Sequence, residues 1–275
     1  MSDHDADPGL HTLLDGLERF RATSPAAGVL LLTMSRPEKM NAMDQVWFAE
    51  LTGVMGALAD QSTYRAVVLT GEGRAFSAGG DIDMFHDLDG DVTRVRPHLA
   101  RVYEAFHAVE RCPVPVVAAV GGLALGGGSE LSLACDVVLA GRSARFAFKE
   151  VSVGLMPGYG IVRGPDVLGR PWTRYLALTG RTIDADAALR AGLVHEAYDD
   201  EDLLPAAIDL AREIAARPPL AVQVGKAFVN RDTTTGFQES VEAIALLFGT
   251  SEHRDAVAAF RSGARDGVAV GRTAE

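Results

Sequence analysis

The first 170 residues alternate between short apolar runs and stretches in which apolar residues recur at helical spacing. An apolar run of a few residues, bounded by turn residues, is typical of a buried strand. Five such runs predict strands at residues 29–34, 66–69, 114–120, 136–140 and 144–148. Asp44 precedes a stretch with helical period and predicts a capped helix through residue 60. The alternation predicts an α/β fold.

The two ends of the chain differ from this pattern. After Pro171, apolar residues follow a helical period, and helices are expected at residues 172–178, 185–191, 203–216, 221–230 and 237–260. Residues 1–25 carry a short amphipathic patch before Pro25 and predict a poorly fixed, variable arm. The chain is therefore divided into an arm at 1–25, an α/β core at 26–200 and a helical part at 201–275.

The charge balance narrows the classes of ligand. Lys and Arg number 26 against 37 Asp and Glu, a formal net charge of -11. A basic nucleic-acid binder is disfavoured, and an anionic ligand must be held by local backbone dipoles or a few basic side chains. Cys112 and Cys135 are too few for a disulfide framework or a thiolate metal site. The seven histidines show no ligand spacing, so no metal is expected.

Targeting and membrane signals are also missing from the pattern. The acidic first residues lack the cationic start and apolar centre of a signal peptide or a mitochondrial presequence. The longest apolar runs, at 114–120 and 137–140, fall far short of the roughly 20 residues that a membrane helix needs. A soluble, cytoplasmic protein without a membrane partner is expected.

Two glycine-rich loops each precede a predicted helix. Gly79 and Gly80 come before residues 81–85, and Gly126–Gly128 come before residues 129–134. Free N–H groups at a helix start favour a negative oxygen, and the helix dipole reinforces them. If the loops face one another, they form an oxyanion hole, in which each well-placed donor contributes about 3 to 4 kcal/mol. The structural alternative is that these glycines permit tight turns and close packing.

Two glutamates stand close to these loops in sequence. Glu130 falls in the first turn of the helix after the triple glycine, and Glu150 follows the strand predicted at 144–148. Each has a structural alternative, as a first-turn acid for Glu130 and as a surface acid for Glu150. Together, in a site with apolar walls, two carboxylates can hold one water and exchange protons with it as general base and general acid.

Several segments together resemble the enoyl-CoA hydratase/isomerase (crotonase) family. They occur in the family's order and spacing, and the resemblance covers about residues 28–261. The segments are SRPEKMNAM at 35–43, GEGRAFSAGGDI at 71–82, PVVAAVGG at 115–122, ALGGGSE at 124–130 and AGLV at 191–194. The resemblance implies a crotonase-like (ClpP/crotonase) spiral of ββα units with a helical C-terminal trimerisation part.

The resemblance also implies a reaction and a set of roles. The backbone N–H groups of Gly80 and Gly127 would hold the thioester oxygen of an acyl-CoA as it becomes an enolate. Glu130 and Glu150 match the two catalytic glutamates of the family's hydratases. The implied function is enoyl-CoA hydratase, the syn addition of water to a 2-enoyl-CoA that gives a 3-hydroxyacyl-CoA. Neither a metal nor a redox cofactor is implied, since CoA is part of the substrate.

The family pattern further implies how the substrate is bound and how the chain assembles. Residues that would line the CoA path, mainly through backbone groups, are Lys39, Met40, Ala42, Ala78, Asp81 and Ile82. A homotrimer, or a hexamer built as a dimer of trimers, is implied as the assembly. Residues 158–164 depart from the family's glycine-rich stretch, so the resemblance leaves acyl-chain specificity open.

Other functions remain open at this point. An enoyl-CoA isomerase needs one glutamate to shuttle a proton, and other acyl-CoA lyases and hydrolases share the fold. Ser77, in the string AFSAG, resembles a nucleophile elbow, so an α/β-hydrolase would use Ser77, His195 and either Asp136 or Asp184. A non-catalytic acyl-CoA-binding protein is the last alternative.

Overall fold

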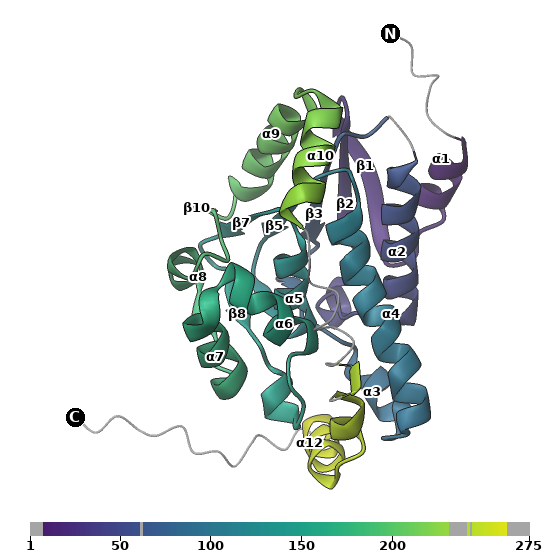
Figure 1. The fold of residues 1–275 in the computed structure, drawn as a ribbon, viewed down its shortest axis with the longest axis vertical. Coiled ribbons are helices and arrows are strands. Elements are labelled where there is room, and N and C mark those ends of the chain that lie inside the picture. Colours follow the sequence, from purple (N-terminus) through teal and green to yellow (C-terminus); the bar gives the residue numbers. More distant parts are fainter. Residues whose placement is uncertain (1–7, 61–62, 231–240, 243, 263–275) are drawn as a thin grey trace, which may run out of the picture.

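Two sheets form the centre of the molecule in this computed structural model, which describes residues 8–60, 63–230, 241–242 and 244–262 (Figure 1). The larger sheet has the strand order β1-β2-β3-β5-β7-β10, and the smaller has the order β4-β6-β8-β9. The strands are β1 (Phe20–Ala26), β2 (Val29–Met34), β3 (Ala66–Gly71), β4 (Ala75–Ser77), β5 (Val116–Val120), β6 (Leu123–Leu125), β7 (Val137–Gly141), β8 (Arg145–Ala147), β9 (Ile183–Asp184) and β10 (Glu196–Tyr198).

The chain passes repeatedly from the larger sheet to the smaller and then into a helix. In the larger sheet, β2, β3, β5, β7 and β10 are parallel neighbours. In the smaller, β4, β6 and β8 are parallel. Each pair β3–β4, β5–β6 and β7–β8 is followed by a helix or a 3-10 turn, so the repeating unit is ββα. The predicted spiral of ββα units is confirmed.

Helices cover both faces of the larger sheet. They are α1 (Pro8–Asp15), α2 (Gln45–Ala59), α3 (Ile82–Leu88), α4 (Val92–Arg111), α5 (Gly127–Ala134), α6 (Gly158–Val167), α7 (Gly169–Thr179), α8 (Ala185–Ala191), α9 (Leu203–Ala215), α10 (Pro219–Val229) and α12 (Ser251–Arg261), with 3-10 turns η1 (Pro37–Lys39) and η2 (Glu150–Val153). One face of the sheet packs against α9 through Val68, Val117 and Ala207, which are fully buried. The other face belongs to the main core with α2 and α4.

The five predicted strands and the capped helix are present. Asp44 accepts a hydrogen bond from the amide of Trp47 and caps α2, as the sequence pattern predicts. The interpretation of residues 8–25 as a poorly fixed arm is wrong, because they form α1 and β1. Strand β1 pairs antiparallel with β2, and Phe20 is buried against Trp47. Residues 1–7 lie outside the described residues.

Two helical regions differ from the sequence interpretation. Helix α4, of 20 residues, was not anticipated, although its apolar positions follow a helical period. The stretch predicted at 237–260 does not run as one helix, since Gly249 and Thr250 separate residues 244–248 from α12. Its first residues lie outside the described part, and the three-part division of the chain stays a prediction. Among the described helices, none is long and apolar enough to span a membrane.

Candidate active site

The loop before α3 is held by a short ladder to residues 40–43. The amide of Met43 donates to the carbonyl of Gly79 at 2.8 Å, and the amide of Asp81 donates back to the Met43 carbonyl at 2.9 Å. Asn41 adopts a left-handed conformation, with φ 54°, and its side chain donates to the carbonyls of Glu72 and Ala75. The sequence segment at 35–43 therefore fixes the position of the first glycine loop.

The two glycine loops pack backbone against backbone. Gly79 has φ +87°, and a Cβ there would lie 2.7 Å from the Leu125 carbonyl oxygen and 3.0 Å from the Gly127 nitrogen. A Cβ on Gly127 would in turn lie 3.7 Å from the Gly80 nitrogen. These glycines therefore do permit close packing of the two loops. The same close approach places the amides of Gly80 and Gly127 near one another.

Those two amides are available to a ligand. In the part of the chain that the structure describes, neither the Gly80 nor the Gly127 amide donates to a protein acceptor. Gly127 is the first residue of α5, where orphan N–H groups and the helix dipole favour a negative oxygen. Both glycines line one cavity, together with Glu130 and Glu150. The arrangement has the elements of an oxyanion hole.

The cavity that these residues share has a volume of about 80 Å³ and a mostly apolar wall. Its apolar side chains come from α2, α3, α4 and the C-terminal helical residues, among them Phe48, Met84, Phe85, Val102, Phe106 and Phe248. Sequence reasoning missed these residues. The amphipathic period of α4 was the signal that could have found part of this wall.

Glu130 is buried in the first turn of α5, at the wall of the cavity. Its Oε1 accepts a hydrogen bond of 2.8 Å from the amide of Gly160, which lies in the first turn of α6. Burial raises the pKa of Glu130 to about 7, against the opposing effect of the Gly160 and Tyr159 amides. The role of Gly160 was not apparent from the sequence, because it depends on how α6 packs.

Glu150 opens the turn η2 and places its carboxyl group beside the second glycine loop. A Cβ on Gly126, which has φ +52°, would lie 2.8 Å from the Glu150 Oε1. Although the residue as a whole is partly exposed, its Oε2 is buried and has no hydrogen-bond partner among the described residues. Burial and the negative charge of Glu130 raise the pKa of Glu150 well above its ordinary value.

The protonation of the two glutamates is coupled, because the charge of Glu130 raises the pKa of Glu150. Like charges in a buried site cannot both ionise easily, so the pair holds a proton to a higher pH than an exposed carboxyl group does. A carboxylic acid beside a carboxylate supplies a proton donor and a proton acceptor within one cavity. The chemistry that this allows is proton removal at one atom and proton delivery at a neighbouring atom.

The residues predicted along the CoA path lie at the joined segments 39–42 and 78–82. Ala78 donates its amide to the Met40 carbonyl at 2.9 Å, and Ala42 is buried beside them. Asp81 caps α3, in which Ile82 is the first residue, and pairs with Arg36 at 2.8 Å. Lys39 pairs with Asp83 at 3.0 Å on the surface. The structure brings these segments together, and their contact with CoA stays a prediction.

The alternative catalytic triad does not assemble. Ser77 is fully buried, and its Oγ donates to the Asn41 carbonyl and accepts from the Gly79 amide. His195 accepts from the Val138 amide through Nδ1 and lines a different cavity. Asp136 is ion-paired with Lys226, and Asp184 caps α8. Ser77 does not line the cavity that contains His195 and Asp136, and each of these side chains already has a structural hydrogen bond or ion pair.

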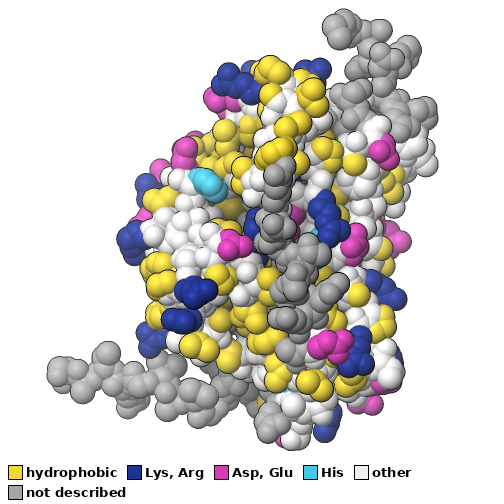
Figure 2. Space-filling model, viewed as in Figure 1, with side chains coloured by type: hydrophobic (Ala, Val, Ile, Leu, Met, Phe, Trp, Pro, Cys, Tyr) yellow, Lys and Arg dark blue, Asp and Glu magenta, His cyan; other side chains and the backbone are white. Residues whose placement is uncertain are grey.

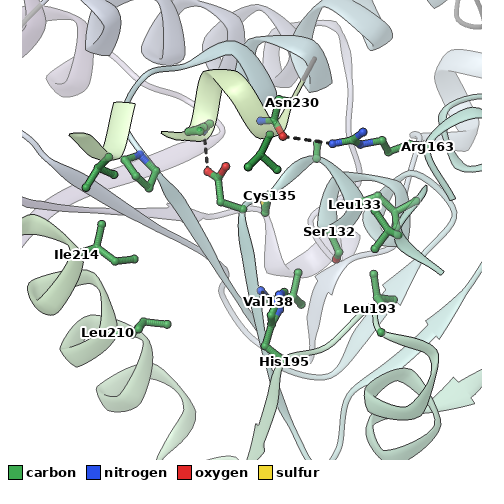
Figure 3. A pocket seen from close by; sticks show the side chains of 18 of the residues that line it. Ser132, Leu133, Cys135, Val138, Arg163, Leu193, His195, Leu210, Ile214 and Asn230 are labelled. Carbon is green, nitrogen blue, oxygen red and sulfur yellow. Dashed lines mark hydrogen bonds and ion pairs between the residues drawn. The ribbon is translucent and has the colours of Figure 1, made fainter. Parts of the chain in front are cut away.

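That second cavity is larger, at about 580 Å³, and lies between α5, α6, α9 and α10 (Figure 3). Three of its charged side chains are held in ion pairs. Lys226 contacts Asp136 at 2.7 Å, and Arg163 contacts Glu110 at 2.8 Å. Figure 3 also shows Arg163 reaching Asn230. Over the described residues, no group of three or more His, Cys, Asp and Glu side chains comes together as a metal site would require.

Comparison with known proteins agrees with this geometry. The family model described as enoyl-CoA hydratase/isomerase matches residues 24–264. Human mitochondrial Delta(3,5)-Delta(2,4)-dienoyl-CoA isomerase is 38% identical, over 83% of this chain and 73% of its own. The short-chain-enoyl-CoA hydratase of Clostridium acetobutylicum is 35% identical, over 84% of this chain and 90% of its own.

Solved structures show the same fold. An enoyl-CoA hydratase/isomerase from Xanthobacter autotrophicus Py2 superposes with a TM-score of 0.82 at 28% identity, covering 90% of this chain and 94% of its own. One from Mycobacterium paratuberculosis gives a TM-score of 0.81 at 30% identity, covering 87% and 97%. With the family model spanning most of the chain, the protein is an enzyme that belongs to the enoyl-CoA hydratase/isomerase family.

Proposed function

We propose that the enzyme hydrates 2-enoyl-CoA thioesters, with Glu130 and Glu150 as its acid–base pair. The observation that carries the proposal is the shared cavity, in which two buried acids face the free amides of Gly80 and Gly127. Hydration needs proton transfer at two adjacent carbons and charge stabilisation at the thioester oxygen, and these four groups supply both. The hydratases among the relatives support the assignment.

The hydrogen bonds of the two glutamates support a division of roles, because the Gly160 amide donates to Glu130 and so favours its carboxylate. Glu150, whose Oε2 has no hydrogen-bond donor among the described residues, is the protonated partner and the proton donor. Glu130, with a pKa of about 7, is the base. In the proposed reaction, Glu130 takes a proton from water as the water oxygen bonds to C3. The C2–C3 π electrons move to form an enolate, whose oxygen the two amides stabilise.

The second proton completes the addition. Glu150 gives its proton to C2 as the enolate collapses to the thioester, so water adds across the double bond from the side that both acids face. The proton gained by Glu130 and the one lost by Glu150 then re-equilibrate through the pair and solvent. No atom changes oxidation state through an external partner, so the step calls for no redox cofactor.

We also propose that the chain assembles as a homotrimer or as a dimer of trimers. Helix α10 leaves large apolar side chains in contact with solvent, with Leu220 71% and Val229 81% exposed. The space-filling view shows apolar side chains gathered over this helix (Figure 2). Such a surface is typical of a protein–protein contact. A cytoplasmic location likewise stays a proposal.

An isomerase is the second candidate. It is favoured by the 38% identity to the human dienoyl-CoA isomerase, compared with 35% to the Clostridium acetobutylicum hydratase. A single glutamate that removes a proton from one carbon and returns it to another would suffice for this reaction. The amides at Gly80 and Gly127 would serve an enolate in either case.

Absorbance at the enoyl-thioester band tests both candidates. Wild type is expected to hydrate crotonyl-CoA, with kcat/KM rising as the pH approaches about 7 and Glu130 loses its proton. Glu130→Gln and Glu150→Gln should each lower kcat by about 10³-fold, because each removes one proton-transfer group. Glu104→Gln, at an exposed acid of α4, is the matched control and should leave kcat unchanged.

Two results would contradict the hydratase assignment. If wild type leaves every 2-enoyl-CoA unchanged but converts a 3-enoyl-CoA, the enzyme is an isomerase. If acyl-CoA binds without any turnover, and both glutamine variants bind it equally well, the pair has no catalytic role.

A further inference from the structure

An imidazole ring lies in the mostly apolar wall of the active-site cavity. His98, on α4, is 2% exposed and lines the same cavity as Glu130 and Glu150. It lies edge-on between two aromatic rings, with its centroid 6.0 Å from that of Phe48 and 6.3 Å from that of Phe85. The reaction as proposed gives this imidazole no part.

The neighbours of His98 fix where its proton sits. Arg101 donates to the Oε1 of Gln45 at 3.2 Å, so the amide oxygen of Gln45 is turned toward the guanidinium. The Gln45 Nε2 then faces the Nδ1 of His98 at 2.8 Å. Because an amide nitrogen can only donate, Nδ1 is the acceptor and the ring proton is on Nε2.

The Nε2–H of His98 is left without a partner. No hydrogen-bond acceptor for it is found among the residues that the structure describes. Burial and the charge of Arg101 lower the pKa of His98 to about 4, so the ring is neutral at physiological pH. An N–H donor in a mostly apolar cavity wall favours a ligand that supplies an acceptor to it.

The position of His98 relates this donor to the bound acyl group. A Cβ on Gly80 would lie 2.5 Å from the Cζ of Phe85, so the Phe85 ring rests against the glycine whose amide is proposed to hold the thioester oxygen. On its other contacts, the Phe85 ring packs edge-on against the ring of His98. An acyl chain whose thioester oxygen is held at Gly80 thus has His98 in the wall of the cavity it enters.

We propose that the His98 Nε2–H donates a hydrogen bond to an uncharged oxygen on the acyl chain, beyond C3, so that the enzyme selects oxygen-bearing acyl-CoA thioesters over plain alkyl ones. A carboxylate is a poor ligand for this place, because the cavity already contains two acids and the ring carries no charge. A ketone or an ester carbonyl fits a neutral donor. This inference rests on the proposed function of the same cavity.

Equilibrium binding of saturated thioesters tests the inference without relying on turnover. The ligands are 5-oxohexanoyl-CoA, hexanoyl-CoA and adipoyl-CoA, measured by titration calorimetry on the full chain. Wild type should bind the oxo ligand about tenfold more tightly than the alkyl ligand, which is the effect of one buried hydrogen bond. It should bind the carboxylate ligand most weakly.

Variants at His98 then assign the preference to the ring N–H. In His98→Phe, which keeps an aromatic ring between Phe48 and Phe85, the oxo-to-alkyl affinity ratio should fall to about one. In His98→Gln, which keeps an N–H donor, part of the ratio should survive. His11→Phe, the same exchange at an exposed position of α1, is the control and should keep the wild-type ratio.

The outcomes separate this inference from the proposed function. If wild type binds the oxo and alkyl ligands equally, or prefers adipoyl-CoA, the inference is overturned, and the N–H is satisfied within the protein, for instance by an aromatic face. If wild type shows the oxo preference yet leaves crotonyl-CoA and 2-hexenoyl-CoA unhydrated, the hydratase assignment fails while the recognition by His98 stands.

Discussion

The two cavities of this protein differ in size and in the way their charged groups are satisfied. The larger, about 580 Å³, contains Asp136 and Arg163, and each has an oppositely charged partner within 3 Å. The smaller, about 80 Å³, contains Glu130 and Glu150, with no Lys or Arg among its described lining residues. Functional chemistry is therefore indicated by unsatisfied buried groups, and cavity volume alone would point to the wrong place.

Burial by itself does not explain why the acids of the two cavities differ in how easily they ionise. Burial raises the pKa of Asp136 and of Glu110 as well, but Lys226 and Arg163 act in the opposite direction. For Glu150 the neighbouring charge is negative and adds to the effect of burial. The larger cavity is thus a structural region with neutralised acids, and the smaller one stores free energy in a pair of acids that resist ionisation.

The largest expected effect comes from removing the charge of Lys226 in the larger cavity. Lys226 has a side chain 6% exposed, pairs with Asp136 and donates to the Val109 carbonyl at 3.0 Å. Lys226→Met should lower the free energy of unfolding by about 3 to 5 kcal/mol, because it leaves Asp136 buried without its counter-ion. Urea denaturation followed by circular dichroism measures this loss.

A surface ion pair provides the control for Lys226. Arg212 contacts Asp209 at 2.8 Å, and both side chains are more than 60% exposed. Arg212→Met should change the free energy of unfolding by no more than about 0.5 kcal/mol. Equal losses in Lys226→Met and Arg212→Met would mean that the larger cavity does not depend on its ion pair.

The second substitution, in the smaller cavity, is expected to stabilise the protein instead of destabilising it. Glu150→Gln should raise the free energy of unfolding at pH 7, since the raised pKa of Glu150 makes its ionised form less favourable in the folded than in the unfolded wild-type chain. A raised carboxyl pKa gives a folded state that binds more protons, so wild-type stability falls as the pH rises above about 4.5. The advantage of the variant should therefore vanish near pH 4.5.

Denaturation at pH 4.5, 6 and 7 checks the sign. A variant that is less stable than wild type at pH 7, or equally more stable at all three pH values, would show that the charge pair is not the cause. Greater stability together with lost activity would mean that the smaller cavity gives up stability for function.

Features of the site that depend on residues adjacent in sequence could be predicted better than features that depend on tertiary packing. The glycine loops and both glutamates could be identified, because a glycine at a helix start and an acid in the next turn are properties of neighbouring residues. The cavity wall could not. Phe85 lies against Gly80, and His98, from another helix, contacts Phe85; the packing of α3 against α4 that joins them is not visible in a local sequence pattern.

The N-terminal segment and Glu130 show the same limit. Phe20 becomes part of a strand because β2 offers it an edge and Trp47 a surface, neither of which is adjacent in sequence. Burial raises the pKa of Glu130, and the amide of Gly160, which reaches it from another helix at a separation of 30 residues, lowers it. Fold class follows from periodicity, whereas the properties of the site depend on tertiary contacts.

The smallest expected effect tests whether the two cavities are independent. Helix α6 serves both, because its Gly160 amide contacts Glu130 and its Arg163, three residues further on, contacts Asn230 at 3.4 Å in the larger cavity. Asn230 also donates to the Glu110 carbonyl at 3.0 Å. Asn230→Ala should lower the free energy of unfolding by about 1 kcal/mol, the usual net effect of a lost hydrogen bond, and leave kcat for crotonyl-CoA within twofold. If kcat falls tenfold while stability changes as expected, Asn230 helps to set the position of the Gly160 amide, and the larger cavity takes part in catalysis through α6.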